Sequence, residues 1–345
     1  MKPILAVTVG DPAGIGPEIA IKAMNHPEIY TICTPLLIGD APVLQKAMKF
    51  CGLKLKLHQV TEPEECAGTY GIIDYLETGA MKNDLYSMGQ VSDLCGNAGF
   101  SYVVKGIELA LAKKVRAVVT GPINKEALNL AGHHFSGHTE IFAQYTHTPS
   151  YAMMLVSKSL RVIHVTTHVS MRDACNLITK DRVLNIIRLA SETLKELGLS
   201  DAVIAVAGLN AHCSENGLFG NEENDAIIPA VLEAEAEGIR VEGPIPADTV
   251  FIKAMSGKYA MVVCMYHDQG HIPLKMSGFE FNSRTGEFTS VSGVNCTVGL
   301  PIIRTSVDHG TAFDRAGNGS AKEESLIDSI KMAVTMALHR FSNKE

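Results

Sequence analysis

Short apolar runs alternate with longer segments of helical period along most of the chain. Residues 98–114 and 180–197 carry apolar side chains at every third or fourth position, which predicts amphipathic helices. The apolar runs between such segments predict buried strands. This alternation is typical of a largely parallel sheet with helices on both faces. Strands are expected at residues 4–9, 115–120, 160–166, 202–209 and 259–266, and further helices from Gly16 and over 225–237 and 321–341.

One segment departs from this alternation. Residues 279–293 (FEFNSRTGEFTSVSG) are polar and rich in turn-forming residues, with Thr285 and Gly286 between two short alternating runs. Such a pattern predicts a β-hairpin at the surface.

The length and apolar content narrow the class of protein. A chain of 345 residues with 46% hydrophobic residues suits two folded domains or one large α/β unit, and it excludes a disordered chain. The longest wholly apolar run, residues 259–266, has eight residues, whereas a bilayer-spanning helix needs about 20. The N-terminal residues also lack the pattern of a signal peptide. We therefore expect a cytoplasmic protein with no membrane partner.

Charge and cysteine content exclude two further classes. The formal net charge is −7, from 30 basic and 37 acidic residues without a basic block, so nothing indicates a nucleic-acid partner. The eight cysteines are scattered without a Cys-x-x-Cys pair, which favours reduced, mostly buried thiols over a disulfide framework. The 13 histidines are more informative because several lie in polar, glycine-rich surroundings.

Three histidines each follow a predicted strand, namely His168, His212 and His267, and His138 precedes a helical segment. Any one of them is more often a structural histidine. Because the carboxyl ends of parallel strands meet at one edge of a sheet, the three together could also form an open nitrogen site for a divalent cation. The spacing alone leaves both interpretations open.

Two glycine-rich loops are further candidates. Residues 10–18 form a strand-to-helix turn that matches neither a dinucleotide fingerprint nor a phosphate loop. Residues 309–321 form a polar loop before the last helix, which is either a connection with Ser320 capping that helix or a loop that wraps an adenosine.

Three polar residues stand among apolar stretches near these segments. Lys275, Asn295 and Arg304 are individually typical of surface side chains, but together they suit a phosphate or a carboxylate.

These features resemble the 4-hydroxythreonine-4-phosphate dehydrogenase family over nearly the whole chain. More distantly, residues 14–18 and 309–321 are similar to isopropylmalate and isocitrate dehydrogenases. The family motifs are GDPAGIGPE (10–18), GPINK (121–125), GHTE (137–140), TTH (166–168), PADT (246–249), MYHDQG (265–270), GLP (299–301) and RTSVDHGT (304–311).

The resemblance implies two α/β/α domains of the isocitrate/isopropylmalate dehydrogenase type with the active site in the interdomain cleft. Residues 1–125 plus 300–345 would form a discontinuous domain with the dinucleotide loop, and residues 126–299 a second domain with the metal and dimer contacts. It further implies NAD, one divalent cation (Zn, Co, Mn or Mg), a small phosphorylated substrate and a homodimer that shares the metal site between subunits.

The resemblance also assigns roles to residues. Polarity and position, not the resemblance, make Lys125 and Asp248 candidates for the catalytic base, although Asp248 could equally be a helix N-cap. The metal ligands would be His168, His212 and His267; the substrate contacts His138, Thr139, Lys275, Asn295 and Arg304; and the cofactor contacts Gly14, His309, Gly310, Thr311, Asp314 and Asn318.

Two departures from the family pattern bear on the substrate. Residues 210–217 read NAHCSENG where the family commonly has Asn-Pro-His-Ala-Gly-Glu, and the segment between Lys275 and Asn295 is longer than in the vitamin B6 pathway enzymes. Both features resemble the paralogous branch that oxidises 4-phospho-D-threonate and 4-phospho-D-erythronate.

The expected reaction is therefore oxidation of the C3 hydroxyl followed by decarboxylation to dihydroxyacetone phosphate. The alternatives are a 4-hydroxythreonine-4-phosphate dehydrogenase of pyridoxal phosphate biosynthesis, a metal-dependent phospho-sugar lyase, and a non-catalytic sugar-phosphate binding protein.

Overall fold

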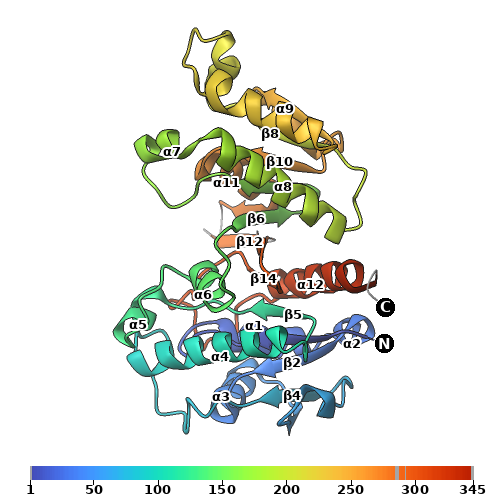
Figure 1. The fold of residues 1–345 in the computed structure, drawn as a ribbon. Coiled ribbons are helices and arrows are strands. Elements are labelled where there is room, and N and C mark those ends of the chain that lie inside the picture. The colour runs from blue at the N-terminus through green and yellow to red at the C-terminus, as the bar shows by residue number, and fades with distance from the viewer. Residues whose placement is uncertain (1, 284–286, 292, 343–345) are drawn as a thin grey trace. The chain divides into compact units, whose positions relative to one another are not determined.

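The computed structural model describes residues 2–283, 287–291 and 293–342 (Figure 1). The chain divides into two compact units, Met1–Pro149 with Leu300–Glu345 (unit 1) and Ser150–Gly299 (unit 2). Each unit has a sheet flanked by helices, so the predicted α/β class is confirmed.

Unit 1 contains six parallel strands in the order β3-β4-β2-β1-β5-β14. The two strands predicted in its first part are present, although each is shorter than expected. Most of these strands are buried along their length, as expected for a parallel sheet covered by helices. The strands are β1 (Ile4–Thr8), β2 (Thr34–Ile38), β3 (Lys56–Gln59), β4 (Ile72–Leu76), β5 (Ala117–Thr120) and β14 (Ile303–Val307).

The helices of unit 1 include the predicted one at Gly16, which begins with Pro17 in its first turn. The long helix α4 packs on β1 and β5, and its Gly106 lies close to Val118 of β5. The last helix, α12, packs on β14, and Thr305 donates to the Ser329 carbonyl. The helices are α1 (Gly16–Met24), α2 (Pro27–Ile32), α3 (Ala41–Cys51), the 3-10 turn η1 (Pro63–Glu65), α4 (Asp93–Leu111), α5 (Lys125–Leu130), α6 (His138–Tyr145) and α12 (Glu324–Ser342).

Within the described residues, six strands of unit 2 pair in the order β13-β6-β7-β10-β8-β9. The four strands from β7 to β9 are parallel, whereas β6 runs antiparallel to both of its neighbours. The three strands predicted here are all present. The strands are β6 (Ala152–Ser157), β7 (Leu160–His164), β8 (Ile204–Ala207), β9 (Val241–Ile245), β10 (Met261–Cys264) and β13 (Val294–Val298).

The helices of unit 2 include α8, whose apolar stripe Val183, Ile187, Ala190 and Leu194 is buried as predicted. The segment predicted as one helix over 225–237 begins as the π-helical turn η3 (Glu223–Ile227) and continues as α9 (Ile228–Ala236). The other helices are α7 (Met171–Leu177), α8 (Lys180–Glu196), the short turn η2 (Ala211–Glu215), α10 (Ala247–Met255) and α11 (His267–Gly278).

The predicted hairpin is present as β11 (Phe279–Asn282) paired antiparallel with β12 (Glu287–Val291). Its expected turn at Thr285 and Gly286 lies outside the described residues.

Two helix caps that the sequence left open as alternatives are not present. Helix α12 begins at Glu324, so Ser320 lies before its first turn and does not cap it. Helix α10 begins at Ala247 with Pro246 at the N-cap, so Asp248 lies in the first turn and is not the cap.

The first division between the units falls after Pro149, not near residue 125. Helices α5 and α6 pack on α4 of unit 1: Gly96 lies against the Ala127 backbone, and the rings of Phe100 and Tyr145 meet edge to face with centroids 6.0 Å apart. Within the described residues, no helix combines the length and the apolar character that a membrane span needs.

Candidate active site

The strand order of unit 2 places the three candidate metal ligands after three adjacent strands. His168 follows β7, His267 follows β10, and His212 follows β8, and these strands are neighbours in the order β7-β10-β8. Because the strands are parallel, all three histidines lie at the same edge of this sheet.

Two of the three imidazoles form a pair. The ring centroids of His168 and His267 are 5.7 Å apart, and both side chains are at least partly exposed. His267 Nδ1 donates to the Asp268 carboxylate at 2.7 Å, which leaves Nε2 of the neutral ring with its lone pair. This arrangement is typical of a histidine that ligates a metal through Nε2.

The third histidine stands in an unusual turn. The five residues from His212 to Asn216 all have positive φ, between 46° and 63°, in a left-handed conformation that non-glycine residues rarely adopt. Among the described residues, no group of three or more His, Cys, Asp and Glu side chains is arranged to hold a metal ion. A single chain therefore brings His168 and His267 together, and His212 lies on the loop after the neighbouring strand β8.

Buried polar side chains hold the loops that carry these histidines. The Gln269 amide donates to the Gly208 carbonyl (2.8 Å) after β8, and its oxygen accepts from the Met265 backbone N–H (2.7 Å) after β10. The fully buried Glu223 accepts from the backbone N–H groups of Leu209 (2.8 Å) and Asn210 (2.7 Å). These contacts fix the strand ends next to His212 and His267.

Two further histidines extend the pair inward. The His271 ring stacks on His267 with centroids 3.6 Å apart, and its Nδ1 donates to the His267 carbonyl. The His164 ring lies 4.8 Å from His271. Burial lowers the pKa of His164 to about 3 and that of His271 to about 4, so both are neutral near pH 7.

The other candidates of unit 2 lie on different elements. Lys275 is exposed on α11, two turns after His267, with its ammonium 5.4 Å from the Phe279 ring centroid. Asn295 lies on β13 opposite Leu155, and Asp248 is exposed on α10. These three side chains therefore come from three different elements of unit 2.

In unit 1, Arg304 is the centre of a buried cationic site. It lies on β14 with 2% of its surface exposed, donates to Thr120 Oγ1 at 2.9 Å, and stands over the Phe142 ring at 5.7 Å. Its planar, permanently charged donor set suits a carboxylate or a phosphate.

His138 and Lys125 adjoin this site. Burial, with a smaller contribution from the Arg304 charge, holds the pKa of His138 well below its usual range, so its ring is neutral. Among the described residues, His138 Nε2 is buried without a hydrogen-bond partner. The exposed Lys125 comes close to Gly137, and Thr139 follows His138 in the first turn of α6. The structure therefore brings His138 and Arg304 together, with Lys125 near the start of α6.

The candidate cofactor loop, residues 309–321, lies against the glycine-rich turn after β1. The Ile15 N–H donates to the Thr311 carbonyl (3.0 Å), and a side chain at Gly14 would meet Thr311 at 2.9 Å. Burial lowers the pKa of His309, whose Nδ1 donates to the Gly310 carbonyl. Gly310, Asp314 and Asn318 are exposed, as residues that contact a ligand can be.

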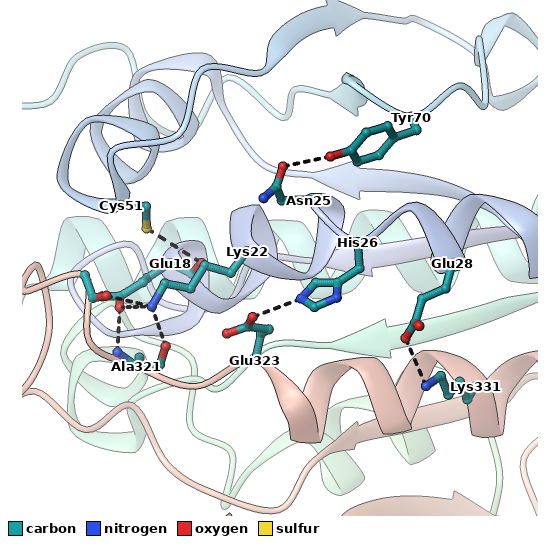
Figure 2. Close-up of polar contacts among 11 residues, drawn as sticks. Glu18, Lys22, Asn25, His26, Glu28, Cys51, Tyr70, Ala321, Glu323 and Lys331 are labelled. Atoms are coloured by element: carbon teal, nitrogen blue, oxygen red, sulfur yellow. Dashed lines mark hydrogen bonds and ion pairs between the residues drawn. The ribbon is translucent and has the colours of Figure 1, made fainter.

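Helix α1 holds the far end of this loop, as Figure 2 shows. Lys22 Nζ donates to Glu18 Oε1 (3.0 Å) and to the carbonyls of Gly319 (2.7 Å) and Ala321 (2.6 Å). Glu18 is fully buried, and its Oε1 also accepts from the Ala321 N–H at 2.6 Å.

Several of these residues are outside the set expected from the sequence, namely Glu18, Lys22, Thr120, Glu223, Gln269 and His271. Glu18 and Gln269 lie inside motifs that the sequence analysis singled out, and His271 is one helical turn after His267. That turn spacing is a signal that could have found His271.

Comparison with known proteins covers almost the whole chain. Residues 31–333 match the family described as pyridoxal phosphate biosynthetic protein PdxA. The chain is 47% identical over 338 residues to a protein of Oceanobacillus iheyensis named "Putative D-threonate 4-phosphate dehydrogenase", covering 97% of this chain and 98% of the relative. A protein of the same name from Symbiobacterium thermophilum is 48% identical, covering 97% of each chain.

Solved structures are also similar to this chain over nearly its whole length. The crystal structure of 4-hydroxythreonine-4-phosphate dehydrogenase from Klebsiella pneumoniae is 41% identical, with a TM-score of 0.86 and 98% of each chain covered. A structure of that name from Burkholderia phymatum is 42% identical, with a TM-score of 0.84, covering 97% of this chain and 98% of that one. This chain therefore belongs to the PdxA family, and it is an oxidoreductase.

Proposed function

We propose that this enzyme oxidises the C3 hydroxyl of D-threonate 4-phosphate with NAD and a divalent cation, followed by loss of the C1 carboxylate as carbon dioxide. The product would be dihydroxyacetone phosphate. The observation that carries this choice of substrate is the 47–48% identity, over nearly full length, to two relatives named for D-threonate 4-phosphate. D-Erythronate 4-phosphate differs only in stereochemistry and is the nearest alternative of the same branch.

Unit 1 would supply the groups that bind the phosphate or the carboxylate. Arg304 carries a permanent charge, and its planar donors suit an anionic oxygen pair. The neutral His138 can donate or accept one hydrogen bond without adding charge, and Thr139 can donate from the first turn of α6. In unit 2, Lys275 and Asn295 would contact the remaining polar groups of the acid.

The divalent cation would be held by His168, His212 and His267. The chemistry of the donors fits, because neutral imidazoles suit Zn²⁺, Co²⁺ or Mn²⁺ in particular and an open site also accepts Mg²⁺. A homodimer that shares this site is supported by exposed apolar side chains of unit 2. Those on the segments that follow the candidate histidines are Val169, Met171, Leu177, Leu218, Phe219, Ile272 and Met276.

The dinucleotide would lie on residues 309–321, with Gly14 allowing the close approach of Thr311. Its contacts would come from His309, Gly310, Thr311, Asp314 and Asn318. When bound, the dinucleotide would supply the hydride acceptor for C3 and the cation would supply a Lewis acid for the C3 oxygen.

This chain must also take up the proton of the C3 hydroxyl. Lys125, next to Gly137, and Asp248, on α10, are the candidates for that base, and both side chains are exposed. A base would have to lie within hydrogen-bond reach of the C3 oxygen in the bound state.

All eight cysteines are free thiols, which supports the reducing cytoplasm as the compartment.

The test is a comparison of kcat/KM for the purified chain on D-threonate 4-phosphate, D-erythronate 4-phosphate and 4-hydroxythreonine 4-phosphate, with NAD and NADP side by side. We expect the highest value for D-threonate 4-phosphate with NAD, measured by NADH absorbance. A wide preference for the amine-bearing substrate would instead support the pyridoxal phosphate pathway, which the family match and the solved structures also suggest. Product formation without any dinucleotide would indicate a lyase.

A further inference from the structure

The polar cluster formed by Glu18 and Lys22 of α1 joins parts of the chain that are about 300 residues apart in sequence. Lys22 directs its ammonium at three acceptors, Glu18 Oε1 and the carbonyls of Gly319 and Ala321, at 2.6 to 3.0 Å. An ammonium has three N–H donors, so these contacts satisfy it fully. Figure 2 shows the Lys22 side chain between Glu18 and the loop.

Glu18 completes the cluster from a fully buried position. Its Oε1 accepts from both Lys22 and the Ala321 N–H. A buried carboxylate is tolerated only when charges and hydrogen bonds compensate it, so removing either partner leaves an uncompensated charge. The loop backbone at residues 319–321 is thus tied to a pair that has little freedom to move.

A second contact fixes the same stretch independently. Gly319 has φ +69° and lies against the C-terminal end of α3, where an added Cβ would stand 2.5 Å from the Phe50 carbonyl oxygen. At its other end, the loop is held by the hydrogen bond between Ile15 and Thr311. Between these two anchors lie the exposed residues Asp314 and Asn318.

We propose that Glu18 and Lys22 are positioning residues for the dinucleotide, holding residues 319–321 so that the loop keeps its binding shape before the cofactor arrives. This inference rests on the proposed binding of NAD by residues 309–321. Neither side chain needs to touch the dinucleotide, because the pair acts through the loop backbone. Without it, only a fraction of the molecules would hold the loop in the competent shape, and the apparent Kd rises in inverse proportion to that fraction.

The test uses the full chain with Lys22→Met, which keeps the apolar stem but removes the ammonium. The dissociation constant of NAD is measured by calorimetry, and KM for NAD, KM for the phosphorylated acid and kcat by steady-state kinetics. If the competent fraction falls to about one tenth, Kd and KM for NAD rise about tenfold. The kcat at saturating NAD and the KM of the acid should stay near the wild-type values.

Two further variants separate positioning from general stability. Lys22→Arg keeps the charge and several donors, and it should restore most of the NAD affinity. Lys331→Met removes the exposed ion pair between Glu28 and Lys331 (3.1 Å), which joins α2 to α12 in the same region without contacting the loop. It should leave the affinity for NAD unchanged.

The outcomes are distinguishable. If the wild type neither binds nor reduces NAD, the proposed function fails and this inference fails with it. If the wild type does so and folded Lys22→Met binds NAD within about twofold of it, the positioning role alone is wrong. Should Lys22→Met not fold, Glu18→Gln is measured in the same way, together with hydrogen exchange of the Ala321 amide. Faster exchange with weaker NAD binding supports the role, and faster exchange with unchanged binding overturns it.

Discussion

In unit 1, Arg304 and the loop of residues 309–321 are held by hydrogen bonds within the fold, whereas the candidate metal ligands of unit 2 are exposed or partly exposed after strand ends. Arg304 is 2% exposed and bonded to Thr120, and the loop of residues 309–321 is anchored at both ends. In contrast, His168 and His267 form a pair of accessible rings, and the buried Gln269 fixes the strand ends beside them.

The two units therefore differ in what their buried polar side chains contact. Unit 1 buries groups that would touch an anion directly, so its geometry exists before a ligand binds. Unit 2 buries groups such as Gln269 and Glu223 that fix backbone, and leaves the nitrogen ligands accessible. An accessible imidazole can bind a cation whose coordination shell is completed by further ligands, whereas a buried imidazole cannot.

The largest expected effect comes from removing one imidazole of the pair. His267→Ala should lower turnover by roughly a thousandfold or more, because the cation would lose a ligand and with it the polarisation of the C3 oxygen. Turnover is followed by NADH absorbance and bound metal by elemental analysis. His339→Ala, at an exposed position on α12, is the matched control. Retention of both bound metal and turnover in His267→Ala would remove the metal site from unit 2.

The next effect is expected from the buried cation of unit 1. Arg304→Lys keeps the charge but loses the planar donor set, so kcat/KM for the phosphorylated acid should fall by about 10²-fold or more. Most of the loss should lie in KM, and inorganic phosphate should become a weaker competitive inhibitor. Arg240→Lys, at an exposed position of unit 2, serves as the control. An unchanged KM would show that Arg304 has a purely structural role.

Much of this comparison could be predicted from the sequence, and the part that could not has a physical reason. The alternation of strands and helices was sufficient to put His168, His212 and His267 at one sheet edge. The burial of Arg304 could not be predicted, because the sequence of a short apolar strand does not show whether its arginine lies in the buried part or at the exposed end. Glu18 and Lys22 have helical i, i+4 spacing, but their bonds to Gly319 and Ala321 depend on a contact about 300 residues away.

A smaller effect is expected from the residues that fix the backbone of unit 2. Gln269→Leu leaves the Gly208 carbonyl and the Met265 N–H buried without their partner, which should cost about 1–3 kcal/mol of unfolding free energy. Since the loops before His212 and His267 would also loosen, metal affinity should fall about 10- to 100-fold. Calorimetric titration with Zn²⁺ and urea unfolding measure the two quantities, with exposed Gln45→Leu as the control. Lower stability with unchanged metal affinity would limit Gln269 to a role in the fold.

The smallest effect is expected at Asp11 of unit 1, which lies in the turn after β1. Its side chain is 1% exposed, Oδ1 accepts from the Ala13 N–H, and Oδ2 is buried without a partner among the described residues. Burial outweighs the backbone hydrogen bonds and raises the pKa of Asp11 from its ordinary 3.8 to about 6. Between these two pH values the folded chain binds more protons at Asp11 than the unfolded chain, so this group makes stability fall as pH rises through that window.

Asp11→Asn keeps the Oδ1 acceptor and removes the charge. At pH 7, where Asp11 is ionised, the variant should therefore be more stable than the wild type by about 1–3 kcal/mol. Near pH 4, where the buried carboxyl is protonated, the difference should vanish. Urea unfolding at several pH values measures this, with exposed Asp201→Asn as a control that should show no such trend. If the wild type instead becomes more stable relative to Asp11→Asn as pH rises, the charged form of Asp11 is stabilised in the fold. Its charge would then be compensated by neighbouring donors, as the charge of Glu18 is.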